Sequence, residues 1–154
     1  MKTILTYGTF DVFHVGHVRM LRRLSELGDR LIVGISTDEF NNQKGKSSLL
    51  SYQDRVEVVE SIKFVDLVIP EESWEQKLQD IEKYEVSVFG IGDDWLGSFD
   101  HLKDYCEVIY LKRTENISST KVRTILGELS LEHIKKIENS AREVAAIFKS
   151  FGVE

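Results

Sequence analysis

Short apolar runs alternate along the chain with longer segments whose apolar residues recur every three or four positions. The short runs fit β-strands, and the wider spacing is typical of helices that bury one face. Strands that alternate with helices predict an α/β domain with a central parallel sheet. We expect its strands at residues 3–8, 31–36, 65–69, 86–91 and 108–111.

Helices are expected between these strands because residues with helical spacing separate the apolar runs. Gly28 suits the C-terminal end of the first helix, and the Ser51 side chain suits the N-terminal cap of the next. The expected helices cover residues 15–27, 52–62 and 74–81, and another starts near Ser118 or Ser119.

Two local features are expected to interrupt the regular pattern. Pro70 lacks a backbone N–H, so it is expected to end the third strand. Residues 41–48 are rich in Asn, Lys, Ser and Gly, which predicts an exposed loop rather than core.

The segment after Gly127 forms a long amphipathic helix in this interpretation. We therefore expect one domain over residues 1–128 and a C-terminal helical extension over residues 129–154. The apolar stripe must be covered by the sheet domain or by a second subunit, because the polar face is not basic enough for a membrane-surface helix. The stripe consists of Leu131, Ile134, Ile137, Ala141, Val144 and Phe148.

Composition narrows the classes of function. The chain has 154 residues and a formal net charge of −6, which argues against general binding to nucleic acids or anionic membranes. No apolar run approaches the roughly eighteen residues of a membrane span, and no secretory signal is recognisable, so we expect no membrane insertion. The single cysteine, Cys106, cannot form an internal disulfide, and the expected location is the reducing cytoplasm.

Residues 8–17 read GTFDVFHVGH at the expected turn between the first strand and the first helix. His14 and His17 lie three residues apart, which places both imidazoles on one face of the helix start. The N–H groups at this end attract anions, and Gly16 lets a ligand approach the backbone, so the pattern favours a phosphate site. A metal site is less favoured because no third nitrogen or sulfur ligand is obvious nearby; two structural histidines are the other alternative.

The motifs GTFD and HVGH resemble the cytidylyltransferase branch of the HxGH nucleotidyltransferase superfamily. Further segments resemble the bacterial glycerol-3-phosphate cytidylyltransferases, and the resemblance covers about residues 2–128. It implies a Rossmann-like three-layer domain and a homodimer that transfers CMP from CTP to sn-glycerol 3-phosphate, with release of pyrophosphate. These segments are STDEFN at 36–41, WEQK at 74–77, GDDW at 92–95 and RTENISST at 113–120.

The resemblance also implies the roles of individual residues. The acceptor phosphate would attack the α-phosphorus of CTP directly, and the nucleotide phosphates would carry Mg²⁺. Lys44 and Lys77 would bind the acceptor. The catalytic residues would be His14, His17, Lys46, Arg113 and Ser119. The nucleotide would be bound by Gly8, Thr9, Phe10, Asp11, His14, Gly16, His17, Lys46, Lys63, Gly92, Asp93, Asp94, Trp95, Arg113, Thr114, Ser118, Ser119 and Thr120.

The chain departs from the family pattern at two positions. Lys63 replaces an arginine, which keeps the charge but loses a bidentate fork. Asn116 replaces a glycine, and asparagine tolerates a left-handed backbone better than other residues with side chains. Ser118 and Ser119 also suit a plain helix cap.

Three other functions remain as alternatives. The segment ISSTKVR at 117–123 also resembles adenylyltransferases, and a related cytidylyltransferase could use ethanolamine phosphate or choline phosphate. A nucleotide sensor without turnover is the third. No aromatic cage for a quaternary ammonium is readable from the sequence, and the lysines suit an anionic acceptor, so glycerol phosphate is favoured. The family resemblance points to CDP-glycerol for teichoic acid or a related polymer.

Overall fold

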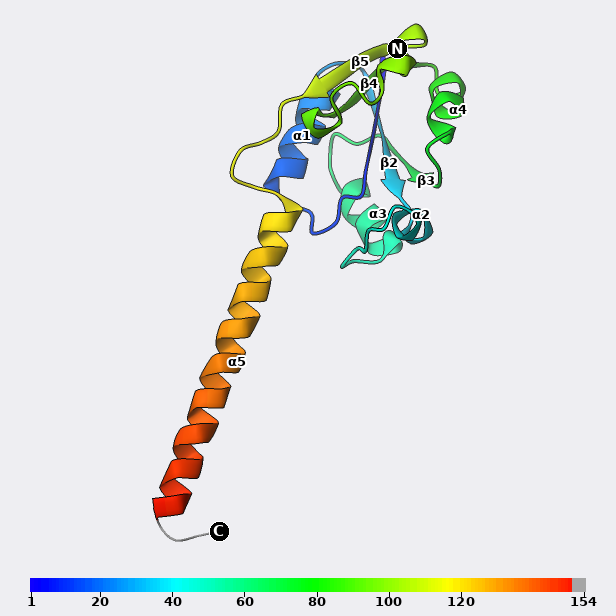
Figure 1. Ribbon diagram of the computed structural model, residues 1–154. Coiled ribbons are helices and arrows are strands. Elements are labelled where there is room, and N and C mark those ends of the chain that lie inside the picture. The colour runs from blue at the N-terminus through cyan, green and yellow to red at the C-terminus, as the bar shows by residue number, and fades with distance from the viewer. Residues whose placement is uncertain (151–154) are drawn as a thin grey trace. The chain divides into compact units, whose positions relative to one another are not determined.

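The computed structural model describes residues 1–150, apart from the side chains of residues 148 and 149. Backbone contacts divide the chain into two compact units, one over Met1–Ser118 and one that begins at Ser119 (Figure 1). The described part of the second unit is a single helix, α5 (Ser119–Ser150), which passes through Gly127 without a break. A glycine inside a helix costs only about 1 kcal/mol relative to alanine, so the helix continues through Gly127, where a boundary was expected.

The first unit is built on a five-stranded sheet in which every pairing is parallel. The strand order is β3-β2-β1-β4-β5, which confirms the predicted Rossmann-like α/β fold. The strands are β1 (Thr3–Gly8), β2 (Arg30–Ser36), β3 (Leu67–Glu71), β4 (Val86–Gly92) and β5 (Glu107–Leu111).

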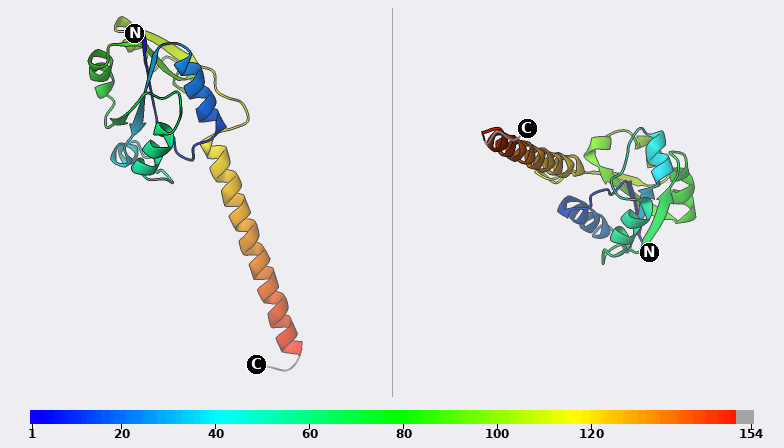
Figure 2. Two further views of the ribbon diagram at one scale, coloured as in Figure 1. Left: turned by 180° about the vertical axis from the view of Figure 1, so that it is seen from behind. Right: turned by 90° about the horizontal axis from the view of Figure 1, so that it is seen from below.

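Helices cover both faces of the sheet and complete a three-layer domain (Figures 1 and 2). On one face, Leu24 of α1 (Val15–Ser25) and Val59 of α3 (Tyr52–Glu60) join a buried apolar cluster. On the other face, Ile81 of α4 (Gln76–Lys83) and Leu102 of the 3-10 helix η2 (Asp100–Asp104) join a second cluster. The two clusters form the core.

The expectation for Pro70 is wrong, because β3 continues through this residue to Glu71. Pro70 pairs in register with Ile35 of β2, and β3 is an edge strand of the sheet. An edge strand tolerates proline because one side of its backbone needs no partner strand.

The loop expected at 41–48 is only partly correct. Residues up to 43 belong to α2 (Asp38–Gln43), and Asn41 is buried. The Thr37 side chain accepts a hydrogen bond from the Phe40 backbone N–H and caps this short helix. The polar composition of the segment favoured a loop and so gave no indication of this helix. The first helix also ends earlier than expected, at Ser25 rather than beside Gly28.

Candidate active site

The site lies at the topological switch point of the sheet, where the strand order reverses. From β1 the chain proceeds to β2 and β3 on one side, whereas β4 lies directly on the other side of β1. Loops that leave two such strands diverge, and ligands of open α/β sheets bind in the crevice between them. Gly8 ends β1 and Gly92 ends β4, so both glycine-containing motifs flank this crevice.

The two histidines are held by reciprocal backbone contacts at the start of α1. His14 is the N-cap, and its Nδ1 accepts a hydrogen bond from the Gly16 N–H over 3.0 Å. Nδ1 of His17 accepts from the His14 N–H over 3.2 Å, and the two rings stack with centroids 4.0 Å apart. Because both Nδ1 atoms accept, each neutral ring carries its proton on Nε2 and can donate it to a ligand.

Gly16 is required by the position of the His14 ring. A Cβ atom at residue 16 would lie 2.7 Å from Cε1 of His14, which is closer than carbon atoms approach without displacement. The glycine therefore makes room for the His14 ring that caps the helix.

Burial keeps both imidazoles neutral. It lowers the pKa of His17 to about 4, with a further contribution from His14. Burial and the Arg113 guanidinium also lower the pKa of His14 from its ordinary value of 6.5. At neutral pH the pair therefore supplies two N–H donors without charge, and the positive charge of the site must come from lysine and arginine.

The turn that delivers the histidines has a strained backbone. Phe10 and Val12 have φ values of 52° and 49°, a left-handed conformation that is unusual for bulky or β-branched residues. The Phe10 side chain is 3% exposed, and its ring centroid lies 5.4 Å from that of His17. Packing of this ring holds the strained turn in place, as is common at functional sites.

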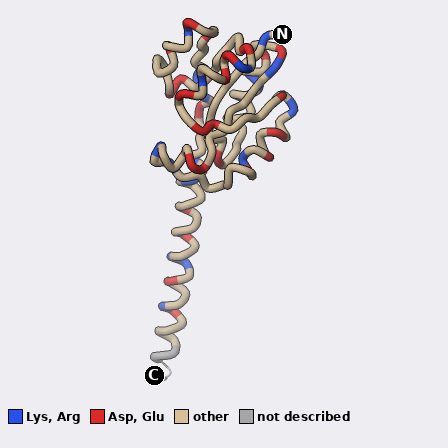
Figure 3. The backbone as a smooth tube through the Cα atoms, turned by 90° about the vertical axis from the view of Figure 1, so that its right-hand side faces the viewer, with Lys and Arg blue, Asp and Glu red and all other residues tan. Residues whose placement is uncertain are grey.

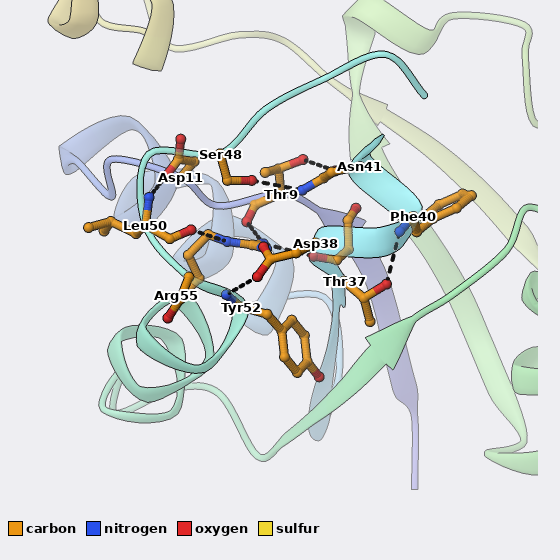
Figure 4. A network of polar contacts seen from close by, with 12 residues as sticks. Thr9, Asp11, Thr37, Asp38, Phe40, Asn41, Ser48, Leu50, Tyr52 and Arg55 are labelled. Atoms are coloured by element: carbon orange, nitrogen blue, oxygen red, sulfur yellow. Dashed lines mark hydrogen bonds and ion pairs between the residues drawn. The ribbon is translucent and has the colours of Figure 1, made fainter. Parts of the chain in front are cut away.

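Asp11 ties the turn to the segment after α2 (Figure 4). Its carboxylate accepts hydrogen bonds from the backbone N–H groups of Leu49 and Leu50 over 2.7 and 3.0 Å. The family resemblance implies a nucleotide contact for Asp11. In the structure these two bonds make it an anchor for the segment that carries Lys46.

Arg55 is a buried part of the same network that sequence analysis missed. Nη1 donates to the carbonyl oxygens of Thr9 and Ser36 over 2.7 and 2.8 Å, and Nη2 contacts Asp38 over 2.7 Å (Figure 4). The side chain thereby joins the ends of β1 and β2 to α2. Its position four residues before the buried Val59, on the inner face of α3, was the available signal.

A pocket of about 420 Å³ opens beside this network. A smaller space of about 100 Å³ shares part of its wall and reaches Gly8 and Thr9 at the end of β1. The lysines expected to bind the acceptor and the phosphates line these spaces. The larger pocket is lined by Phe40, Gln43, Lys44, Lys46, Trp74 and Trp95, and the smaller adds Lys77.

Glu71 organises the lysines and is a second residue that sequence analysis missed. It is 3% exposed, lies 2.6 Å from Nζ of Lys77 and 3.7 Å from Nζ of Lys44, and accepts a hydrogen bond from the Ser36 hydroxyl. Burial lowers the pKa of Lys44; Glu71 opposes this shift, and the Lys46 and Lys77 ammonium groups add to it. The pocket therefore concentrates positive charge around one carboxylate.

The remaining predicted residues fall into three groups. Nη1 of Arg113, after β5, lies 3.7 Å from Asp94 in the 3-10 helix η1 (Asp93–Trp95), and Thr114 follows Arg113.

Lys63 is exposed on the connection that enters β3 at its amino end. It therefore lies away from the carboxyl ends of the strands, which carry the site, and its role stays a prediction. Ser118 ends the first unit, while Ser119 and Thr120 open α5, which forms the second unit.

The departure at Asn116 behaves as expected. Its φ of 66° is the left-handed value that the glycine of the family pattern would supply.

A doubly wound parallel sheet with an HxGH motif at its switch point is typical of the class of nucleotidyltransferases. Within that class the chain belongs to the cytidylyltransferase-like family, whose profile matches residues 5–125. Glycerol-3-phosphate cytidylyltransferase of Bacillus spizizenii is 56% identical over 129 residues, which are 84% of this chain and the whole of that protein. The enzyme of the same name from Staphylococcus aureus is 58% identical over 80% of this chain and 93% of its own.

A solved structure supports the fold independently. The lipopolysaccharide core biosynthesis protein of Thermoplasma volcanium superposes with a TM-score of 0.64 over 75% of this chain and 99% of its own. At 19% sequence identity this likeness concerns the fold alone.

Proposed function

We propose that the protein transfers CMP from CTP to sn-glycerol 3-phosphate and releases CDP-glycerol and pyrophosphate. The observation that carries this proposal is the identity of 56% and 58% to two enzymes of that name, over nearly their full lengths. The lysine pocket, by which we mean the two spaces lined by Lys44, Lys46 and Lys77 at the end of β1, agrees with it, because a phosphorylated acceptor requires positive charge beside the reacting phosphate.

The reaction needs no proton removed from the nucleophile. An oxygen of the acceptor phosphate, which is largely dianionic at neutral pH, forms a bond to the α-phosphorus while the bond to the bridging α–β oxygen breaks. The electron pair leaves with pyrophosphate. Neutral histidines suit this chemistry, since His14 and His17 act as N–H donors to oxygens that gain charge rather than as bases.

Two anions must approach each other for the attack, so positive charge has to screen them. Lys46 and Lys44 would lie between the acceptor phosphate and the α-phosphate, and Arg113 would hold the outgoing phosphates together with Thr114, Ser118, Ser119 and Thr120. The reciprocal cap at the start of α1 orients the Nε2–H donors of both rings before substrate binds. Lys77 is proposed to bind on the acceptor side.

The nucleoside would lie against the loop after β4. Gly92 and Asp93 would leave room for the ribose, Asp94 would accept from a ribose hydroxyl or the cytosine amino group, and Trp95 would pack beside it. Mg²⁺ would arrive with the triphosphate as part of the substrate. Lys63 would attract the nucleotide phosphates through its charge over a long range.

We further propose that the protein is a cytoplasmic homodimer without a nucleic-acid partner. Acidic and basic positions are interspersed along the tube rather than gathered into one basic face (Figure 3).

The apolar stripe of α5 suits a helix that pairs with a second copy. Four of its residues are between 51% and 69% exposed, namely Leu131, Ile134, Ile137 and Val144. Phe148 has its side chain outside the described residues. None of the helices over residues 1–150 is long and apolar enough for a membrane span.

A pyrophosphate-release assay tests the proposed function. CTP and ATP are each combined with glycerol 3-phosphate, ethanolamine phosphate and choline phosphate in excess Mg²⁺. CTP with sn-glycerol 3-phosphate is expected to give the highest turnover, and CDP-glycerol is identified by mass. Faster turnover with ATP would replace the cytidylyl assignment with an adenylyl one, and no release of pyrophosphate with any pair would favour a nucleotide sensor.

The proposed product, CDP-glycerol, would serve the synthesis of a polymer such as teichoic acid.

A further inference from the structure

The ammonium group of Lys77 lies among three aromatic rings. Nζ is 4.5 Å from the ring centroid of Tyr7, 4.8 Å from that of Trp74 and 5.7 Å from that of Phe99. Glu71 Oε1 lies 2.6 Å from the same Nζ, and the Lys77 side chain is 3% exposed. We call Glu71, Tyr7, Trp74 and Phe99 the cation cage.

Rings and a carboxylate around one point form a binding site for an ammonium ion. The faces of aromatic rings carry negative potential and attract cations within about 6 Å, most strongly where water is excluded. Tyr7 is held by its own hydrogen bond, because its hydroxyl donates to Asp80 over 2.6 Å. The cage is therefore rigid on at least this side, and its present occupant is a side chain of the protein itself.

The cage could not be seen in the sequence because its parts come from different elements. Tyr7 belongs to β1, Glu71 ends β3, Trp74 follows β3, and Phe99 immediately precedes η2. Only the strand order brings them together beside α4, which supplies Lys77.

We propose that Lys77 is a specificity-determining residue: its ammonium fills the cation cage in the acceptor pocket, so that acceptors carrying an ammonium group are refused. The role of Lys77 in selecting the acceptor rests on the proposed function, whereas the contacts of its ammonium group with the cation cage do not. The other lysines reinforce the effect. Nζ of Lys44 lies 4.2 Å from the Phe40 ring centroid, and Nζ of Lys46 lies 5.7 Å from that of Trp95. An incoming cation meets like charges on these aromatic faces also.

Removal of the Lys77 side chain should convert the filled cage into an open site. Lys77→Ala deletes three carbons and the ammonium, which together have the composition of propylammonium. Glu71 then lacks its nearest cation while it stays buried, so a small alkylammonium ion gains both an ion pair and ring contacts on entry. The wild-type protein offers no such space.

The first test is direct binding of propylammonium to the purified Lys77→Ala protein. The emission of Trp74 and Trp95, the two tryptophans of the chain, reports on the pocket. We expect a saturable change with a Kd on the order of 10 mM and a rise in Tm. Wild type and Lys103→Ala, which alters a half-exposed lysine of η2, serve as controls and should show neither effect.

Propan-1-ol separates a cation site from a mere cavity. It has the same chain length as propylammonium but no charge. No saturable binding of propan-1-ol to Lys77→Ala and no comparable rise in Tm are therefore expected. Equal effects of propan-1-ol and propylammonium, or no binding of propylammonium to a folded Lys77→Ala protein, would overturn the proposal. In Lys77→Ala/Glu71→Gln, where the carboxylate charge is absent, binding should weaken at least tenfold; undiminished binding would also count against it.

A variant that does not fold still gives a decisive measurement. Propylammonium should then raise the folded yield of Lys77→Ala on dilution from urea, while propan-1-ol should not. An identical yield with either additive would refute the cage.

The second test concerns the choice of acceptor. Lys77→Ala should shift the ratio of kcat/KM for ethanolamine phosphate over glycerol 3-phosphate by about tenfold to a hundredfold in favour of the amine. An unchanged ratio in a variant that binds propylammonium would overturn the specificity role. Failure of the wild-type protein to use glycerol 3-phosphate would instead overturn the proposed function, and the titration of the cage would remain interpretable.

Discussion

The backbone N–H of His14 donates to Nδ1 of His17 over 3.2 Å, while the His14 ring caps the same helix start. One pair of side chains thus forms the reciprocal helix cap and fixes which ring nitrogens can donate to a ligand. A cap contributes about 1 kcal/mol to stability, whereas a donor aligned with a charge that grows in the transition state contributes several times more to the rate.

His14→Ala and His17→Ala should therefore each lower kcat by about a hundredfold or more, with only a modest fall in the free energy of unfolding. Steady-state kinetics in excess Mg²⁺ and urea denaturation of the same preparations measure the two effects. Arg19→Ala, an exposed change on α1, is the matched control. Near-normal kcat in both folded histidine variants would remove the catalytic assignment, and restoration by added zinc would indicate a metal site.

Stability should fall as the pH drops from 6.5 toward 4, because of His17. Its folded pKa of about 4 lies below the ordinary value of 6.5, so the unfolded chain binds more protons in this interval. The neutral ring's contribution is thus present above pH 6.5 and lost through the interval. Urea denaturation at pH 7, 5.5 and 4.5 should show a shallower decline for His17→Gln than for wild type. Parallel declines would contradict the assignment.

Arg55→Met should destabilise the first unit by about 2–4 kcal/mol. The substitution keeps much of the side-chain volume but leaves the carbonyl oxygens of Thr9 and Ser36 without their donor in a buried place. Arg19→Met, on an exposed position, should change the free energy of unfolding by less than about 0.5 kcal/mol. Equal effects of the two substitutions would show that the Arg55 network adds nothing to stability.

Truncation after Glu128 should preserve turnover and weaken self-association. The relative from B. spizizenii matches over its full length within 84% of this chain, so the extension is not part of that enzyme. Light scattering across a concentration series gives the oligomeric state, and the pyrophosphate assay gives activity. A folded, equally associated truncation without activity would assign the helix to the active site.

The sequence predicted those parts of the site that lie close together along the chain. His14, Gly16 and His17 share one turn, and their spacing alone places them on one face. The positions of β1, β2, β4 and β5 were also predictable, because apolar runs mark buried strands of a parallel sheet whatever their order, whereas β3 lies at Leu67–Glu71 rather than at 65–69.

Parts of the site that depend on strand order were not predictable. Glu71 and Tyr7 are distant in sequence and share the lysine pocket only because β1 lies two strands from β3. Pro70 was misjudged for the same reason, since a proline is compatible with an edge strand and not with a central one. Arg55 and Asn41 are polar residues in buried positions, which composition assigns to the surface unless their partners are known.

Pro70 also affects how the outer edge of β3 can pair. It has no N–H to offer, and its carbonyl oxygen accepts a hydrogen bond from Nε2 of Gln76 over 2.8 Å. The Gln76 amide thus occupies an acceptor that a foreign strand would need, near the carboxyl end of β3. This part of the β3 edge is consequently guarded against edge-to-edge pairing, which favours association of copies through other surfaces.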